Sequence, residues 1–262
     1  MAYDDFGLGS PVLSIHCHPF NRKMWTPQVQ ALRWRYRTIA PDLRGYGESA
    51  PSSAHTHTQQ MYATDLLSLL DHLDIEQAYV VGLSMGGQIA MEFARAFPER
   101  TAALVLVPTF PEAETAEGRV ERERAARRIE VEGTVAIGSE MLPKLLGRKT
   151  MKENPRLALE IFGMICSASS SGAAAAVRGR GLRQDYRSSL QHSSKSTMLV
   201  LGTDNSFMSI AVGEWLKASM HDCRLDVGHM PNLEAPDRFN RCLDSFLDSV
   251  KGTMHSQANT SK

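Results

Sequence analysis

One serine in the sequence stands in surroundings that could turn its hydroxyl into a nucleophile. Ser84 lies between Gly82 and Gly86, and a short apolar run, residues 79–83, leads into it. A helix-like pattern follows at once. Gly-x-Ser-x-Gly between a strand and a helix forms a sharp turn that exposes the serine hydroxyl above the sheet edge. The helix that begins there also presents unpaired N–H groups, which favour negative charge. A turn without chemistry is the alternative, but the flanking patterns favour the functional interpretation.

Alternating strand and helix patterns surround this serine and must position it. Near-continuous apolar strands that alternate with helices predict a parallel sheet covered on both faces. Between residues 110 and 196 the pattern changes to helices without a convincing strand. Such an insertion is more often a lid over a site than a separate domain. The expected strands are residues 12–15, 37–40, 79–83, 104–107, 198–201 and 223–227.

The charge balance and the cysteines exclude several classes of protein. The 262 residues include 29 basic and 29 acidic ones, so neither a nucleic acid nor an acidic membrane is an expected partner. The arginine-rich run 119–128 has interleaved glutamates, which favours a solvated helix face over a polyanion site. No signal peptide and no membrane span is expected. Four scattered cysteines are expected to be reduced thiols in a cytoplasmic protein: Cys17, Cys166, Cys223 and Cys242.

Four segments follow one another in a fixed order along the chain. They are His16-Cys17-His18-Pro19 with Met24-Trp25, then Pro41–Ser49, Gly82–Gly87 and Gly228–Glu234. In this order they resemble the oxyanion loop, a typical loop, the nucleophile elbow and the catalytic histidine loop of the α/β-hydrolase fold family. The resemblance covers nearly the whole chain. The elbow and the expected lid are most similar to bacterial serine esterases and lactonases, including 3-oxoadipate enol-lactonases and cofactor-free haloperoxidase-like members.

The resemblance implies an α/β-hydrolase fold, with a mostly parallel central sheet, helices on both faces and a helical lid inserted after the strand ending near Val107. Family members usually have a strand hairpin at the N-terminus. Only residues 2–9 are available for this hairpin before the first expected strand, which leaves open whether an edge strand forms. The expected division is residues 1–109 and 197–252 for the hydrolase core, 110–196 for the lid and 253–262 for a disordered tail.

The resemblance also assigns the catalytic groups. A serine hydroxyl is a poor nucleophile until a base takes its proton. Ser84 is the expected nucleophile and His229 the expected base, a surface-loop histidine being the alternative. The backbone N–H groups of His18 and Met85 are expected to form the oxyanion hole.

Cys17 departs from the family pattern, because a glycine usually stands at this position. A β-carbon there narrows the loop or forces a different backbone dihedral angle. The adjacent side chains of residues 16–18 do not easily face one ion, and no partner ligands have motif spacing. No metal site and no cofactor is therefore expected.

The residue that orients His229 is ambiguous. The family places an aspartate in a Gly-x-x-Asp segment after the strand 198–201, and this chain has Asn205 at the matching position, directly after Asp204. Asp204 is the first choice, through a one-residue shift of the loop. The alternatives are Asn205 as a neutral acceptor, or an absent acid. An aspartate-to-asparagine change in a serine protease triad costs about 10⁴ in kcat, so the choice decides the expected activity. Some family members carry an acid after the strand that ends near Val107, and this chain has Pro108 there. Asp222 and Asp226 are further candidate carboxylates near the C-terminus.

The leading functional expectation is a serine hydrolase that cleaves an ester or lactone through an acyl-enzyme on Ser84. The substrate is expected to be a small to medium, partly apolar molecule, with Met164 and Met208 among its contacts. Core packing is the alternative for these methionines. The protein is expected to be a monomer or homodimer without nucleic-acid or membrane partners. Further candidates for the apolar pocket are Met141, Leu142 and Ile165.

Two other functions stay open. One is a biosynthetic homologue with changed chemistry, such as elimination, C–C cleavage or acyl transfer, which the departures at Cys17, Pro108 and Asn205 motivate. The other is a non-catalytic ligand-binding protein of the same fold. Retention of both Ser84 and His229 argues against a binder, because binding needs neither residue.

Overall fold

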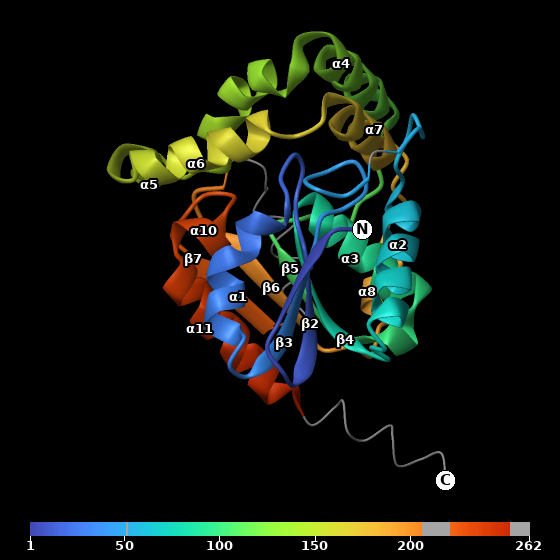
Figure 1. The fold of residues 1–262 in the computed structure, drawn as a ribbon, viewed down its shortest axis with the longest axis vertical. Coiled ribbons are helices and arrows are strands. Elements are labelled where there is room, and N and C mark those ends of the chain that lie inside the picture. Colours follow the sequence, from blue (N-terminus) through green and yellow to red (C-terminus); the bar gives the residue numbers. More distant parts are fainter. Residues whose placement is uncertain (51, 206–220, 252–262) are drawn as a thin grey trace.

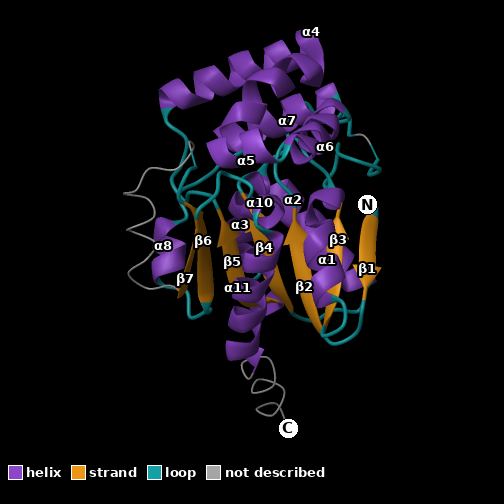
Figure 2. Ribbon diagram, turned by 90° about the vertical axis from the view of Figure 1, so that its left-hand side faces the viewer, coloured by secondary structure: helices purple, strands orange, loops and turns teal. Residues whose placement is uncertain are grey.

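A twisted sheet with helices on both faces forms the body of the protein (Figures 1 and 2). The computed structural model describes residues 1–50, 52–205 and 221–251. Within them the sheet has seven strands in the order β1-β3-β2-β4-β5-β6-β7. All neighbouring pairs are parallel except β1 with β3. The strands are β1 (Tyr3–Phe6), β2 (Ser10–Ile15), β3 (Tyr36–Pro41), β4 (Ala78–Leu83), β5 (Thr101–Val107), β6 (Thr197–Gly202) and β7 (His221–Leu225).

Helices cover the two faces of the sheet and one of its edges. In Figure 1, α1 and α11 lie on one face and α2 and α3 on the other. The described helices before the long insertion are η1 (Arg22–Trp25), α1 (Thr26–Leu32), α2 (Gln59–His72), α3 (Met85–Ala96) and η2 (Pro98–Arg100). Those after β5 are α4 (Ala116–Leu145), α5 (Arg148–Glu153), α6 (Pro155–Cys166), α7 (Ser170–Gly181), α8 (Arg187–Gln191), α10 (Pro231–Glu234) and α11 (Pro236–Ser249).

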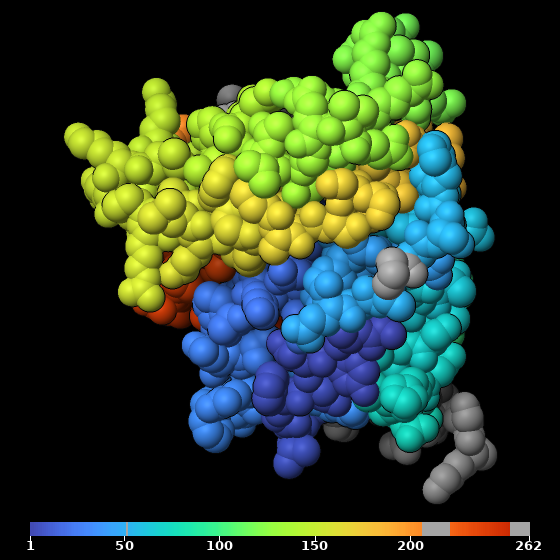
Figure 3. All heavy atoms as spheres, turned by 45° about the horizontal axis from the view of Figure 1, so that its top comes forward, coloured from blue at the N-terminus to red at the C-terminus, as the bar shows by residue number. Residues whose placement is uncertain are grey.

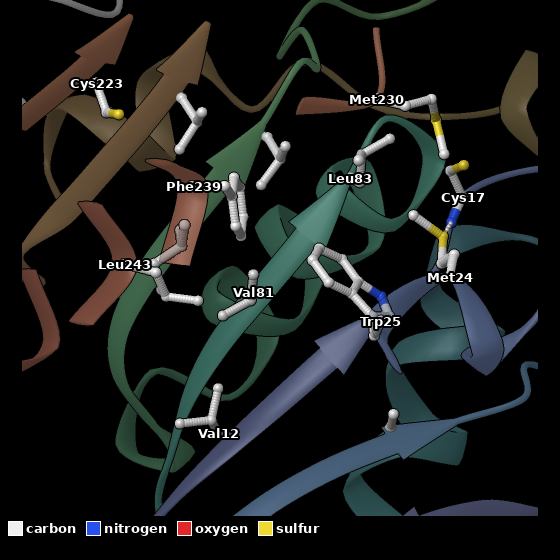
Figure 4. Packing of buried hydrophobic residues seen from close by; sticks show 14 of the residues in the cluster. Val12, Cys17, Met24, Trp25, Val81, Leu83, Cys223, Met230, Phe239 and Leu243 are labelled. Carbon is white, nitrogen blue, oxygen red and sulfur yellow. Dashed lines mark hydrogen bonds between the residues drawn. The ribbon is translucent and has the colours of Figure 1, made fainter. Parts of the chain in front are cut away.

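Apolar strands buried on both sides explain this layering. Every residue of β4 and β5 is buried. Successive side chains of a strand point to opposite faces, so Val81 joins the cluster under α1 and α11, whereas Val80 joins the cluster under α2 and α3. Figure 4 shows the first cluster, in which Trp25 and Phe239 come from opposite ends of the chain. The sequence prediction of a parallel sheet covered on both faces is confirmed.

Four helices between β5 and β6 lie across the carboxyl edge of the sheet, and we call α4–α7 the cap (Figures 1 and 2). Helix α7 packs against α4 and also lies close to the loop after β3. A β-carbon on Gly172 or Gly179 would collide with the carbonyl oxygens of Gly45 and His57. The small residues of α7 therefore let the cap approach the sheet loops closely. In Figure 3 the cap, in green to gold, forms the upper part of the molecule above the N-terminal segments in blue.

The helical insertion differs from the expected lid at its C-terminal end. Helix α8 contacts α3, and Leu190 on α8 is buried in the cluster under α2 and α3. The part of residues 110–196 that lies over the sheet edge is therefore shorter than the sequence division suggests. The expected disordered tail, residues 253–262, lies outside the described residues.

The N-terminal edge strand that the sequence left open is formed. β1 pairs antiparallel with β3, from Tyr3 opposite Pro41 to Phe6 opposite Thr38. Its short polar sequence lacks a hydrophobic run, because an edge strand that is exposed on one side needs only backbone pairing with its neighbour.

The prediction of four reduced cysteines is wrong for one pair. Cys223 in β7 and Cys242 in α11 form a disulfide, with Cα atoms 6.4 Å apart. The two residues are 19 positions apart in the sequence, and only the packing of α11 on β7 brings them together. Cys17 and Cys166 are free thiols. The cytoplasmic location, which was inferred from reduced thiols, stays a prediction.

The described part of the chain has no single helix that is long and apolar enough to span a membrane. One pair, α6 with α7, meets the length and composition criteria jointly, but the two helices are bent by 90°.

Candidate active site

Ser84 lies at the junction of β4 and α3 with an unusual backbone conformation. Its φ and ψ angles are 53° and −111°. A non-glycine residue in such a region costs about 1–3 kcal/mol, so neighbouring groups must hold it. The N–H of Ser84 donates to the carbonyl of Val107 (3.1 Å), and the hydroxyl of Thr109 donates to the carbonyl of Ser84 (2.8 Å). The sharp turn predicted from the motif is therefore formed.

The two glycines of the motif are required by close backbone contacts. A β-carbon on Gly82 would collide with the carbonyl oxygen of Gly86. A β-carbon on Gly86 would collide with the carbonyl oxygens of Ile15 and His16. The second contact brings the first turn of α3 against the loop after β2. The glycines thus bring together the two segments that were expected to form the oxyanion hole.

The backbone N–H groups of His18 and Met85 are available for an oxyanion. Met85 is the first residue of α3, and the first N–H groups of a helix have no partner within it. Among the described residues, neither N–H has a hydrogen-bond acceptor. Both residues are buried. Two buried donors without an acceptor, beside a serine at a helix N-terminus, can stabilise a developing negative charge.

The side chains of the loop after β2 have structural partners. His16 Nδ1 lies 2.9 Å from the carbonyl oxygen of Cys17, and its Nε2 accepts the N–H of Leu43 (3.0 Å). Burial lowers the pKa of His16 to about 4, so the ring is neutral at pH 7. His18 Nδ1 lies 2.7 Å from the hydroxyl of Tyr46. The described residues contain no group of three or more potential metal ligands.

Cys17 fits its position because its side chain turns into the core. It is fully buried in the cluster under α1 and α11, near Met24 and Met230 (Figure 4). Burial raises the pKa of its thiol well above the usual range, so the group is not a nucleophile at neutral pH. The β-carbon that replaces the usual glycine is therefore accommodated as core packing.

His229 lies at the same sheet edge as Ser84. It follows β7, and the parallel neighbours β4, β5, β6 and β7 all end at this edge. Leu83 and Met230, the sequence neighbours of Ser84 and His229, belong to one buried cluster and lie in the same part of Figure 4. The N–H of His229 donates to the carbonyl of Leu145 at the end of α4 (2.9 Å). The structure thus brings the expected nucleophile and base to one region under the cap.

The environment of His229 keeps its imidazole neutral. The ring is buried, and burial followed by the positive charge of Arg180 lowers the pKa of His229 to about 3. Nδ1 lies 3.1 Å from Oδ1 of Asn205, an acceptor, so Nδ1 carries the proton. Nε2 is then the basic nitrogen, as a proton acceptor for a serine hydroxyl requires.

The structure differs from the sequence expectation for Asp204. Its carboxylate accepts the N–H of Arg148 in the cap (2.9 Å) and lies 3.6 Å from the guanidinium of the same residue. The side chain that contacts His229 is that of Asn205. The turn after β6 therefore keeps the register of the Gly-x-x-Asp segment, without the one-residue shift, and places an amide where the family has a carboxylate.

A second carboxylate connects the cap to the histidine loop and was missed by the sequence reasoning. Glu234 accepts hydrogen bonds from the N–H of Gly147 (2.8 Å), the hydroxyl of Thr150 (2.7 Å) and the N–H of Met230 (3.2 Å). It lies in the histidine segment that the sequence singled out, but its spacing alone gave it no role. Cap position and histidine position are therefore coupled through one side chain.

A cavity of about 610 Å³ lies between the cap and the loop after β2. Met141 lines it, as expected for a pocket residue, whereas Met164 packs against the cluster under α1 and α11. Leu142 packs on the same cluster and Ile165 belongs to it. Met208 lies outside the described residues. The cavity walls are more polar than the predicted apolar pocket, and their residues include His18, Glu114, Arg122, Ala125, Ile129, Val177 and Arg180.

A family model and a solved structure both match most of this chain. The family model described as alpha/beta hydrolase fold matches residues 10–236. The structure is similar to that of a thermophilic esterase from Thermogutta terrifontis in a malate-bound form, with a TM-score of 0.90 and 34% identity, covering 95% of this chain and 93% of that one.

Curated relatives cover most of the chain at lower identity. The sequence is 27% identical over 232 residues to 3-oxoadipate enol-lactonase 1 of Acinetobacter baylyi, covering 87% of this chain and 85% of that protein. It is 26% identical over 250 residues to a putative 2-succinyl-6-hydroxy-2,4-cyclohexadiene-1-carboxylate synthase of Bacillus subtilis, covering 91% and 90%.

Proposed function

Because the chain belongs to the alpha/beta hydrolase fold family, we propose that it is a serine hydrolase that cleaves a carboxylic ester or lactone. The observation that carries the proposal is the strained Ser84 at the N-terminus of α3, at the same sheet edge as a neutral histidine whose Nδ1 is bonded to Asn205. The names of an esterase and an enol-lactonase among its relatives support the same class of substrate.

The proposed reaction begins with attack of the Ser84 hydroxyl on the carbonyl carbon. His229 Nε2 takes the hydroxyl proton, and the N–H groups of His18 and Met85 bind the oxyanion. Collapse of the tetrahedral intermediate expels the alkoxide, which receives the proton from His229. Water, deprotonated by His229, then attacks the acyl-enzyme and releases the acid and the free serine.

Asn205 gives this proposed site a particular weakness. Its amide oxygen fixes the tautomer of His229 but supplies no negative charge to stabilise the imidazolium that forms in each step. We expect a working site with slower turnover of simple esters than a site with an ionised acid would give. The expected role of Asp204 is therefore transferred to Asn205.

A fluorophosphonate probe tests the proposal directly. The probe reacts with an activated serine, so the wild-type protein should be labelled at neutral pH and Ser84→Ala should not. A second serine in a helix-capping position, Ser169, offers a matched control, because its hydroxyl accepts the N–H of Gly172 (3.3 Å) and lies 3.0 Å from the hydroxyl of Ser171. Ser169→Ala should be labelled like the wild type. Absence of labelling in the wild type would leave the ligand-binding alternative ahead.

A second candidate function is changed chemistry at the same residues, such as elimination, C–C cleavage or acyl transfer. It is favoured by the amide in the place of the acid and by a relative that is named as a synthase. Mass spectrometry of the protein quenched during turnover of an ester separates the two. An acyl adduct on Ser84 supports hydrolysis through an acyl-enzyme, whereas labelling by the probe without any acyl adduct favours the changed chemistry.

A further inference from the structure

The cavity under the cap has more positive than negative charge on its inner wall. Glu114 accepts hydrogen bonds from both Arg122 and Arg183, so one carboxylate serves two guanidinium groups. Arg180, which lines the same cavity, has no carboxylate within salt-bridge distance among the described residues. Two arginines of the wall, Arg122 and Arg180, therefore share one carboxylate with Arg183, which does not itself line the cavity. The excess would be offset by an anion in the cavity.

The other arginines of the cavity wall are neutralised. Arg124 pairs with Glu121 (the two are within salt-bridge distance), and Arg128 lies 2.6 Å from Glu140. These pairs are exposed, as the sequence predicted for the interleaved run 119–128. Arg122 belongs to the same run but turns inward to Glu114. The unbalanced charge is therefore confined to the inner wall, where Arg180 lies.

Arg180 is held close to the proposed nucleophile. Its Nε donates to Oε1 of Gln88 (3.3 Å). Gln88 lies one helical turn after Ser84, and its N–H donates to the carbonyl of Ser84 (3.1 Å). The positive charge of Arg180 also lowers the pKa of His18 and of His229, after burial as the main cause. The guanidinium thus faces the reaction centre from α7.

The surroundings of Arg180 make a bound anion favourable. Burial, followed by the charges of Arg122 and Arg183, lowers the pKa of Arg180 to about 9. A cation that is disfavoured in this way gains more from a counter-ion than an exposed one does. The planar guanidinium offers parallel donors that match a carboxylate.

We propose that Arg180 binds a carboxylate of the substrate, so that the substrate is an ester or lactone with a free carboxylate a few atoms from the carbonyl that Ser84 attacks. This inference rests on the proposed function, because it names the substrate class of the same site. The geometry that carries it is an arginine without a carboxylate partner in the cavity wall, hydrogen-bonded to the first turn of the helix that begins after Ser84.

The bound carboxylate has a second effect. It offsets the positive charge that Arg180 exerts on His229, and the amide of Asn205, which contacts Nδ1 of His229, carries no charge. The anionic group of the substrate should therefore stabilise the imidazolium in the transition state. Anionic substrates should gain in kcat as well as in KM.

The test compares isosteric esters that differ in one charge. Monomethyl glutarate, monomethyl adipate and monomethyl pimelate are each paired with the ester whose free acid is replaced by a primary amide, and methanol release is measured. For the best chain length, the wild type should prefer the acid over its amide by about 10–100-fold in kcat/KM, as expected for a charge-assisted hydrogen bond. Arg180→Gln should reduce this ratio to near one, and Arg180→Lys should keep part of it.

Arg127→Gln is the matched control, because Arg127 lies on the solvent side of α4 and pairs with Glu123 (2.9 Å). It should keep the full acid-to-amide ratio. A wild-type ratio near one for all three chain lengths, or an unchanged ratio in Arg180→Gln, would overturn the inference.

Binding without turnover separates this inference from the proposed function. Ser84→Ala is titrated with glutarate, adipate and pimelate by calorimetry, with and without the additional change Arg180→Gln. If no ester is hydrolysed but a dicarboxylate binds in an Arg180-dependent way, the hydrolase proposal fails and the carboxylate site stands. If esters are hydrolysed without preference and no dicarboxylate binds, the carboxylate site fails and the hydrolase proposal stands.

Discussion

Asn205→Asp is the most informative single change, because it replaces the neutral amide that contacts His229 by a carboxylate. The carboxylate would lie at the position of the amide oxygen, 3.1 Å from Nδ1 of His229. At that distance the attraction between a carboxylate and an imidazolium is about 5 kcal/mol for an effective dielectric constant of 20. Burial of a new carboxylate costs several kcal/mol, which removes part of this gain.

The remaining stabilisation of the imidazolium is about 1.5–3 kcal/mol, which corresponds to an increase of about 10–100-fold in kcat/KM for a neutral acetate ester. The pH dependence of the rate provides an independent test, because it reports the pKa of His229. The pKa of His229 is lowered to about 3 by burial and Arg180, so the wild-type rate should be flat from about pH 8 down to pH 5. The new carboxylate raises this pKa, and the acid limb of the Asn205→Asp profile should move upward.

Three further variants make the experiment decisive. Asn205→Ala removes the acceptor and should lower the rate at least about tenfold, whereas Asp204→Ala should lower it less, because Asp204 contacts the cap. Asn154→Asp is the matched control, since Asn154 caps α6 on the surface and aspartate caps equally well. The reasoning is refuted if Asn205→Asp neither accelerates the reaction nor shifts the acid limb, or if Asp204→Ala is the more damaging of the two alanine variants.

Three other predictions concern the glycines, the cap and the buried histidines. Gly86→Ala would force a collision with the carbonyl oxygens of Ile15 and His16 and should lower the free energy of unfolding by about 1–3 kcal/mol in urea. Gly163→Ala, with open space around its Cα in α6, should raise the free energy of unfolding by about 0.5–1 kcal/mol. Equal effects of the two variants would contradict the close approach of Gly86 to these carbonyl oxygens. Glu234→Gln leaves one oxygen for three donors. The variant should increase amide hydrogen exchange in residues 145–150 and reduce kcat. The control Glu153→Gln, on the exposed end of α5, should change neither quantity. The pKa of His16 is lowered to about 4 in the folded protein, so the unfolded state binds more protons between pH 6.5 and 4, and stability is constant above pH 6.5 and falls below it. Protonation of His16 in the unfolded state should lower the free energy of unfolding by about 2 kcal/mol at pH 5, measured in urea. A His16→Asn variant with the same loss of stability between pH 6.5 and pH 5 would refute the assignment to His16.

The parts of this protein that follow from local sequence were predicted correctly. The turn at Ser84 depends on two glycines at which an added β-carbon would collide with nearby backbone atoms. The Gly-x-Ser-x-Gly motif contains both glycines, so the sequence alone predicts the turn. The central strands are apolar throughout, and buried parallel strands have that composition. The edge strand Tyr3–Phe6 has no such signal, because its stability comes from backbone pairing with β3.

The partner of a side chain is decided by the fold, as the arginine run and the cysteines illustrate. Arg122 and Arg127 read alike in the sequence, but one turns to Glu114 in the cavity wall and the other pairs on the surface. The pairing of Cys223 with Cys242 depends on how α11 packs on β7. Neither the ion pairs of the arginines nor the disulfide can be predicted from the spacing of these residues in the sequence.

The sequence by itself determined the sheet and the sharp turn at Ser84, because short-range steric and hydrophobic patterns encode them. It also singled out Ser84 and His229 as the candidate nucleophile and base. Only the tertiary structure decided that Asn205 and not Asp204 contacts His229, and that Arg180 faces the reaction centre without a carboxylate partner in the described chain. Both depend on distances between segments that are far apart in the chain. Such distances follow from the packing of the whole domain, and hydrogen bonds and ion pairs between side chains form only where that packing brings their atoms within reach.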